Sequence, residues 1–199
     1  MKDSINKYWT GIDDKLKILL KDGAVKLPSL SIFDLDTLSD NISNELGPLT
    51  FKEGGLSHRK FLDYLQIDKF LSPKLFNLAK EFFGFRGKLS NQYHIARKVL
   101  PGNIKEQFRA HFDSHIFTMV LPIKIPTSSS GQSTGDLIYF SNIRDMPNNE
   151  ISNLFGKVYY KKFASSNGIK KLIKNKNCVT ENFMNYEPLI FLGKTTLHA

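Results

Sequence analysis

The stretch that decides the fold is Arg109-Ala-His-Phe-Asp-Ser-His-Ile-Phe-Thr-Met-Val-Leu-Pro-Ile-Lys-Ile125. It is rich in β-branched and aromatic residues, which predicts a long strand over residues 108–125. Side chains alternate between the two faces of a strand, so we expect His111, Asp113 and His115 to point the same way. Imidazole nitrogens and carboxylate oxygens suit divalent first-row metals, and this face is therefore a candidate metal site.

Shorter apolar segments flank this stretch and are separated by Gly- and Pro-rich punctuation. They predict strands at Gln92–Leu100, Asp136–Phe140, Pro188–Leu192 and Leu197-His198, with a flexible loop at 127–135 and a turn at Gly193-Lys-Thr-Thr196. Several short strands with such punctuation favour an antiparallel barrel or jelly roll with helices packed outside it.

The N-terminal part, residues 1–90, predicts helices and loops. Apolar side chains recur at helical spacing from Ile5 to Leu20, and Gly23 is placed to end that helix. Two further helical patterns cover Phe61–Phe70 and Pro73–Phe83. Without an internal repeat or a convincing linker, the chain is interpreted as a single domain over 1–199, with its β core in 91–199.

Charge is concentrated in one segment. The chain has 28 Lys and Arg against 19 Asp and Glu, a formal net charge of +9, and residues 151–180 contain lysines but no acidic residue. The lysines are Lys157, Lys161, Lys162, Lys170, Lys171, Lys174 and Lys176. Apolar residues recur at helical spacing in the same segment, and Asn149 is a possible N-cap. We therefore predict a basic helical insert over 148–176, either as a solvated surface or as a patch for an anionic ligand.

Several classes of protein are excluded by composition and motifs. No apolar run reaches the ~18 residues of a membrane span, and the N-terminus lacks an apolar signal core. A single cysteine, Cys178, excludes a disulfide framework and a multi-cysteine metal site within the chain. Phosphate-binding loops and the nucleophile-elbow motif are absent from the sequence. We expect a soluble cytoplasmic protein without a membrane partner.

The candidate metal site needs a further ligand from elsewhere in the chain. His198 lies in a predicted strand, and barrel closure can bring distant strands together. Two histidines and one carboxylate on one side of a metal leave positions open for a cosubstrate and dioxygen, as in the non-haem Fe(II) oxygenases.

The His111-Phe-Asp113 segment, Gly135-Asp-Leu-Ile-Tyr-Phe140 and the ending Pro188–His198 resemble the Fe(II)/2-oxoglutarate-dependent dioxygenases. The similarity is greatest to the phytanoyl-CoA dioxygenase-like branch and over residues 90–199. It implies a mainly β protein with flanking helices, built on a double-stranded β-helix (jelly-roll, cupin-like) core. It also implies that His111, Asp113 and His198 hold iron. The expected activity is hydroxylation of a small or carrier-bound substrate by dioxygen, while 2-oxoglutarate becomes succinate and carbon dioxide.

One feature of that family has no counterpart here. Its members carry an Arg or Lys about ten residues after the distal histidine, where it pairs with 2-oxoglutarate. This sequence stops at Ala199, so we expect either a C-terminal truncation or a substitute cation. The candidate cosubstrate contacts are Thr118, Tyr139 and Lys194, and the other possible cations are Lys124, Arg97 and Arg109. His115 is extra to the pattern and is either a neighbour of the iron or a competitor of His111.

Two other function classes stay open. The same barrel could serve a non-catalytic or non-iron cupin-like protein that binds or processes sugars. The segment Lys157–Lys176 could instead form a nucleic-acid-binding module, but no recognised nucleic-acid motif accompanies it. The basic segment therefore favours an anionic substrate or carrier over DNA or RNA.

Overall fold

The computed structural model describes residues 2–90, 92–99, 109–125, 135–147, 149–175 and 177–199. Helices take 44% and strands 16% of the described residues, so the expectation of a mainly β protein is wrong. The protein is a mixed helix and strand structure with small antiparallel sheets.

The described helices agree with most of the helical patterns in the sequence. They are α1 (Lys2–Tyr8), α2 (Ile12–Asp22), the 3-10 helix η1 (Leu30–Ile32), α3 (Leu35–Leu46), α4 (Leu56–Tyr64), α5 (Ile67–Phe70), α6 (Ser72–Phe83), α7 (Glu150–Lys161) and α8 (Ser166–Asn175). Gly11, with φ of 78°, divides the predicted first helix into α1 and α2. Gly23 ends α2 in the left-handed conformation, where its N–H donates to the Leu19 carbonyl. Among these helices, none has the length and apolar character needed to cross a bilayer.

The described strands are β1 (Ala24–Lys26), β2 (Phe51–Glu53), β3 (Ile95–Arg97), β4 (Phe117–Val120), β5 (Leu137–Phe140), β6 (Val179–Glu181), β7 (Leu189–Leu192) and β8 (Leu197–His198). They form sheet 1 in the order β1-β7-β4, sheet 2 in the order β6-β5-β8, and the separate pair β2-β3. All pairings are antiparallel. The predicted strands at 136–140, 188–192 and 197–198 are confirmed.

The long strand predicted at 108–125 is much shorter in the structure. Within it, β4 covers only Phe117–Val120, and His111 makes an isolated bridge. The strand predicted at 92–100 reduces to Ile95–Arg97. Most of the loop predicted at 127–135 lies outside the described residues. Because these two strands are short, this region contains much less β structure than its composition predicts.

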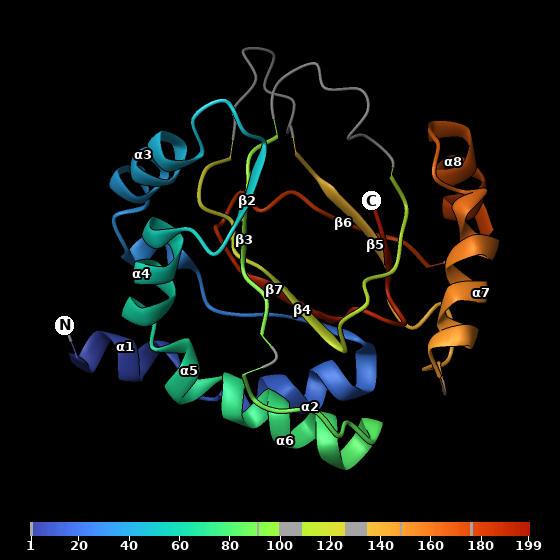
Figure 1. Cartoon of the computed structure of the whole chain (residues 1–199), viewed down its shortest axis with the longest axis horizontal. Helices are drawn as coiled ribbons and strands as arrows, with labels where there is room; N and C mark the ends of the chain where they lie inside the picture. Colours follow the sequence, from blue (N-terminus) through green and yellow to red (C-terminus); the bar gives the residue numbers. More distant parts are fainter. Residues whose placement is uncertain (1, 91, 100–108, 126–134, 148, 176) are drawn as a thin grey trace.

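The central strand β7 is buried on both faces, which explains its uninterrupted apolar sequence. Ile190 and Leu192 pack into the core built by α1, α2 and the neighbouring helices. Leu189 and Phe191 pack with Tyr139 of β5, and so they join sheet 1 to sheet 2. Figure 1 shows α1, α2, α5 and α6 together along one side of these strands.

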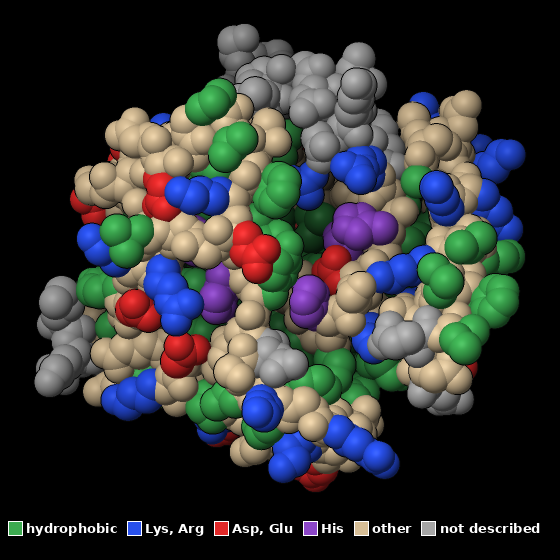
Figure 2. All heavy atoms as spheres, in the orientation of Figure 1, with side chains coloured by type: hydrophobic (Ala, Val, Ile, Leu, Met, Phe, Trp, Pro, Cys, Tyr) green, Lys and Arg blue, Asp and Glu red, His purple; other side chains and the backbone are tan. Residues whose placement is uncertain are grey.

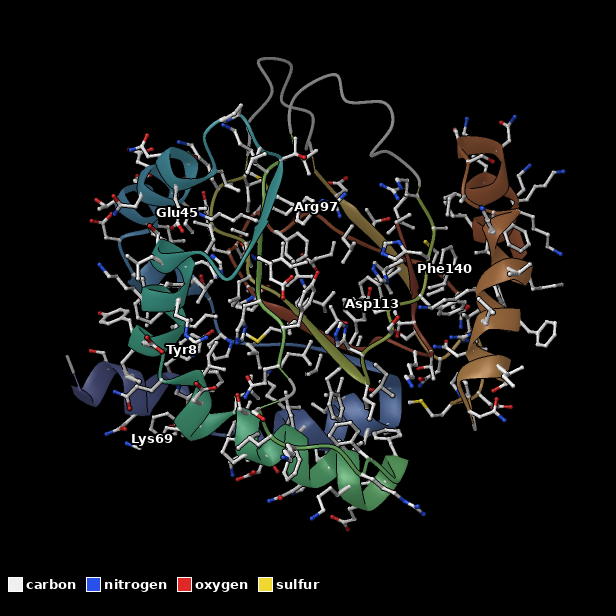
Figure 3. All side chains as sticks on the ribbon, in the orientation of Figure 1. Tyr8, Glu45, Lys69, Arg97, Asp113 and Phe140 are labelled. Atoms are coloured by element: carbon white, nitrogen blue, oxygen red, sulfur yellow. The ribbon has the colours of Figure 1, made fainter. Side chains whose placement is uncertain are left out.

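Sheet 2 is covered on its other face by the predicted basic insert. Phe140 and Leu197 pack with Ile169 and Leu172 of α8. The view with side chains shows Phe140 on the side of the strands that faces α7 and α8 (Figure 3). The insert is helical as predicted, and Asn149 caps α7 by accepting from the N–H of Ser152. The sheets are therefore enclosed between two groups of helices.

Candidate metal centre

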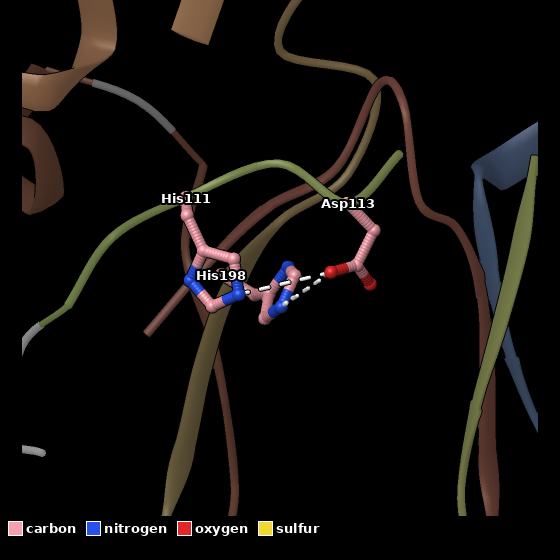
Figure 4. A group of neighbouring side chains, drawn as sticks. All are labelled: His111, Asp113 and His198. Carbon is pink, nitrogen blue, oxygen red and sulfur yellow. Dashed lines mark ion pairs between the residues drawn. The ribbon is translucent and has the colours of Figure 1, made fainter. Parts of the chain in front are cut away.

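Three of the residues expected to bind metal lie together. Ligand atoms of His111, Asp113 and His198 are all within 4.8 Å of one another. Asp113 Oδ1 is 3.7 Å from His111 Nε2 and 3.8 Å from His198 Nε2, and Figure 4 shows both nitrogens directed at this carboxylate. The triad could therefore hold a metal ion.

Backbone pairing brings these distant residues together. His111 and His198 exchange reciprocal N–H to carbonyl hydrogen bonds of 2.9 and 3.1 Å. The Asp113 N–H donates to the Gly193 carbonyl at 3.0 Å, and the Gly193 N–H donates to Ile116 at 2.9 Å. The segment 111–116 therefore crosses from sheet 2, which contains His198, to sheet 1, in which Gly193 directly follows strand β7.

Gly193 permits this close crossing, a role that the sequence alone did not reveal. A Cβ atom at this position would lie 2.7 Å from the His115 carbonyl oxygen and from Thr118 Oγ1, and 3.0 Å from Asp113 Cβ. One of these atoms belongs to the backbone and cannot easily move aside. The turn that follows β7 consequently needs glycine for the triad to form.

The hydrogen bonds of the imidazole rings fix which nitrogen is available to a metal. His111 Nδ1 lies 2.7 Å from the Arg109 carbonyl oxygen, and His198 Nδ1 lies 3.4 Å from that of Thr196. A carbonyl oxygen can only accept, so each Nδ1 is assigned the proton. Each Nε2 lone pair then faces Asp113. Metal-binding histidines are commonly held in this way through their second nitrogen.

Burial keeps His198 neutral. Only 8% of this residue is exposed, and burial lowers its pKa to about 4, against the opposing effect of Asp113. An imidazole must be unprotonated to bind a metal, and His198 meets this requirement at neutral pH.

Thr118 orients the carboxylate of the triad. Its Oγ1 donates a 2.6 Å hydrogen bond to Asp113 Oδ2, which leaves Oδ1 facing the two histidines. The sequence suggested Thr118 as a cosubstrate contact, whereas the structure gives its hydroxyl a bond to a candidate ligand. Phe191 lies beside the triad, with its ring centroid 4.8 Å from that of His198.

The other two predicted cosubstrate contacts lie on elements next to the triad. Tyr139 is directly opposite His198 in the register of β5 and β8, so the two side chains share one face of sheet 2. Burial raises the pKa of the Tyr139 hydroxyl. Lys194 lies in the turn between β7 and β8, where its carbonyl oxygen accepts from Arg144 Nε at 2.7 Å. Binding of 2-oxoglutarate by either residue stays a prediction.

His115 is separate from the triad. Its ring stacks on Tyr93, with centroids 5.4 Å apart and planes inclined by 14°. The expectation that residues 111, 113 and 115 share one face is wrong for His115, because residues 112–116 do not form a strand. Among the alternative cations, Lys124 forms a 3.9 Å ion pair with Asp40 of α3.

The triad is open on one side. Half of the His111 side chain is exposed, compared with 21% for Asp113 and 10% for His198. Figure 2 shows histidine and acidic side chains side by side at a hollow in this face, with Lys and Arg side chains around them. Small molecules could therefore reach a metal bound between the three ligands.

The donor set fits a divalent first-row metal. Two neutral imidazoles and one carboxylate suit Fe²⁺, Mn²⁺, Co²⁺ or Zn²⁺. Bonds of about 2.1 Å place adjacent ligand atoms roughly 3.0–3.5 Å apart. The nitrogen-to-oxygen distances of 3.7 and 3.8 Å are close to this range, and the three ligand atoms, within 4.8 Å of one another, would have to move closer together around the metal.

No family model, curated protein or solved structure matches this chain. An assignment of function therefore rests on the chemistry of the site.

Proposed function

We propose that the protein is a non-haem iron, 2-oxoglutarate-dependent oxygenase that hydroxylates a small or carrier-bound substrate. The observation that carries the proposal is the convergence of two histidine Nε2 atoms and one carboxylate oxygen on a point open to solvent. Three protein ligands leave coordination positions free for a cosubstrate and dioxygen. A structural metal site, in contrast, is closed by four protein ligands, and the group found among the described residues has three.

A double-stranded β-helix core is part of this proposal. Its support is the packing of sheet 1 against sheet 2 through Leu189, Phe191 and Tyr139. The ligand-bearing segment 111–116 is also hydrogen bonded to Gly193, which follows β7, and to His198 of β8. Such a core requires two opposed antiparallel sheets, with the metal ligands on the strands and loops between them.

When bound, ferrous iron supplies the redox chemistry by which dioxygen and 2-oxoglutarate convert R–H into R–OH, with release of succinate and carbon dioxide. In the proposed mechanism His111, Asp113 and His198 hold the metal. Thr118 keeps Asp113 Oδ1 directed at it. The Arg109 carbonyl keeps the proton of His111 on Nδ1, so that Nε2 stays available throughout turnover. Phe191 limits the access of water to the side of His198 that its ring covers.

An anionic substrate or carrier fits the surroundings of the triad. Lys157 of α7 donates a 2.7 Å hydrogen bond to Ser114 Oγ, and Ser114 directly follows the candidate ligand Asp113. A carboxylate or phosphate near this position would gain a charge-assisted contact with the lysine.

Anaerobic titration with Fe(II), followed by measurement of succinate formed from 2-oxoglutarate, tests the proposal. The wild-type chain should bind one Fe(II) and turn over 2-oxoglutarate, whereas Asp113→Ala should lose at least about 100-fold in iron affinity. His115→Ala is the matched control, because it removes a histidine from the same segment that lies outside the triad. Equal iron binding by wild type and Asp113→Ala would contradict the assignment of the ligands.

A second candidate is a cupin-like protein that uses another metal or none. The observation that favours it is the same triad, since two histidines and a carboxylate with an open position also make a catalytic zinc site. Elemental analysis of the purified protein and thermal unfolding with and without 2-oxoglutarate distinguish the two candidates. Zinc in the protein, with no stabilisation by 2-oxoglutarate, would favour the second.

A further inference from the structure

The outer face of α7 is apolar and exposed. Five of its side chains are between 59% and 72% exposed, and they are Ile151, Leu154, Phe155, Val158 and Tyr159. Residues spaced three and four apart lie on one side of a helix, so these five form one continuous stripe. We call this stripe the α7 face.

The inner side of α7 combines a buried asparagine, a glycine and one aromatic side chain, and their contacts fix the orientation of the helix. The buried Asn153 accepts a 2.7 Å hydrogen bond from Arg144 Nη2. Gly156 packs so closely on Arg144 that an added Cβ would overlap its guanidinium. Tyr160 packs edge-on against Phe112, with ring centroids 5.1 Å apart. An ordinary surface helix turns its apolar side inward, and α7 is the reverse.

Lysines flank the α7 face at the C-terminal end of the helix and on α8. Lys161 and Lys162 are exposed at the end of α7, and Lys162 Nζ lies 3.7 Å from the centroid of the Tyr159 ring. Exposed lysines 170, 171 and 174 follow on α8, and no acidic residue occurs between positions 151 and 180. Pairing with a second copy would place like charges together, which opposes association. The charge therefore calls for an anionic partner.

We infer that the α7 face, together with the lysines of α7 and α8, docks on an anionic lipid surface. The helix has 12 residues and is about 18 Å long, too short to span a bilayer. Helices with Leu, Phe and Tyr on one side and lysines around them lie in the plane of the membrane interface. Anionic headgroups attract the lysines while the apolar side chains enter the headgroup and acyl boundary. This inference departs from the sequence-based expectation of no membrane partner.

Docking would place the candidate metal centre close to the lipid surface. α7 contacts the ligand-bearing segment directly through the Lys157 to Ser114 hydrogen bond. Figure 1 shows α7 and α8 at one edge of the molecule, outside the strands, where a flat surface can approach them. The inference does not depend on the metal or on the proposed oxygenase activity.

Co-sedimentation of the full chain with vesicles tests the inference. The vesicles contain phosphatidylcholine alone or equal parts of phosphatidylcholine and phosphatidylglycerol. We expect the wild type to bind the anionic vesicles more tightly than the neutral ones, and high salt to weaken the binding. Leu154→Ser combined with Phe155→Ser should weaken it about tenfold or more, because this change removes apolar area without altering charge.

Two further variants separate the contributions. Lys161→Gln combined with Lys162→Gln keeps the α7 face and should reduce the preference for anionic vesicles. Phe82→Ser is the matched control, because Phe82 is an exposed phenylalanine on α6, and it should bind like wild type. Circular dichroism and urea unfolding of each variant check that the fold is intact, independently of lipid binding.

Three results would overturn the inference. The first is wild-type protein that fails to bind anionic vesicles. The second is equal vesicle binding by the wild type and the Leu154→Ser, Phe155→Ser variant. The third is a dimer, found by size-exclusion chromatography, that the same variant dissociates while vesicle binding is unchanged, because a second copy would then cover the α7 face.

Discussion

Helices α2 and α7 carry similar apolar periodicity and have opposite surroundings. In α2, Ile12, Leu16 and Leu19 are buried in the core that includes Ile190 and Leu192 of β7. In α7 the corresponding apolar side is exposed, because Asn153 and Gly156 form the side that packs on Arg144. Periodicity therefore reveals which side of a helix is apolar, but the surrounding structure decides whether that side is covered.

The largest expected difference between the two helices is in stability. Leu19 is fully buried, so Leu19→Ala should lower the free energy of unfolding by about 2–5 kcal/mol. Leu154→Ala in α7 should change it by no more than about 0.5 kcal/mol, because Leu154 is 62% exposed. Urea unfolding followed by circular dichroism measures both. Similar losses from the two variants would mean that the α7 face is buried in solution.

The candidate metal centre lies between the helices that pack on sheet 1 and those that pack on sheet 2. One of its ligands, His198, makes the free energy of unfolding depend on pH. The pKa of His198 is about 4 in the folded protein against 6.5 for an unperturbed histidine, so the unfolded chain binds more protons between these values. The contribution of the neutral, buried His198 to the free energy of unfolding is therefore fully present above pH 6.5. It decreases as the pH falls towards 4, by on the order of 1–3 kcal/mol.

Urea unfolding of the metal-free protein across this pH range measures the effect. His198→Gln is the control, because glutamine does not titrate there, and its unfolding free energy should change less with pH. If wild type and His198→Gln gave parallel curves, the burial of His198 would not control this dependence.

Much of the N-terminal half followed from the sequence, for a physical reason. The apolar residues that recur at helical spacing there are buried in one large core, so their spacing and their burial agree; they are Ile5, Tyr8, Trp9, Ile12, Leu16 and Leu19. Sequence reasoning was less successful for the strands. Residues 112–116 belong to the stretch predicted as a long strand, yet they form no strand where they cross from sheet 2 to sheet 1. Propensity cannot anticipate such a crossing, because it depends on the hydrogen bonds that Asp113 and Ile116 make with Gly193, far along the sequence.

The triad itself could be proposed from residue types, since His111-Phe-Asp113 and His198 carry suitable donors. Its supporting groups could not. The close approach at Gly193 and the hydrogen bond from Thr118 to Asp113 arise only when β4 and β7 lie side by side. The exclusion of His115 could not be predicted either, because residues 112–116 form no strand and the His115 ring stacks on Tyr93.

Gly193 connects the two sheets, and a substitution there should affect both stability and metal binding. Gly193→Ala would force the His115 carbonyl away from the turn, and we expect a loss of about 1–3 kcal/mol in the free energy of unfolding. Iron affinity should also fall, because Asp113 is hydrogen bonded to the Gly193 carbonyl. Gly135→Ala, at a glycine with a φ of 89° and open space around it, measures backbone strain in the absence of a steric clash. If Gly193→Ala bound iron as tightly as the wild type, the close approach of segment 111–116 to Gly193 would not be what positions Asp113.

The smallest expected effect belongs to Thr118, whose hydroxyl acts on the triad through Asp113. Thr118→Val keeps the shape of the side chain but removes the 2.6 Å hydrogen bond to Asp113 Oδ2, and iron affinity should fall about tenfold. Thr118→Ser retains a hydroxyl and should recover most of that loss. Titration with Fe(II) at neutral pH measures both variants, and unfolding by urea shows whether the fold has changed. If Thr118→Val bound iron like wild type but had a weaker affinity for 2-oxoglutarate, Thr118 would contact the cosubstrate, as the sequence first suggested. A specific loss of iron affinity would instead mean that sheet 1 orients the carboxylate while sheet 2 supplies His198.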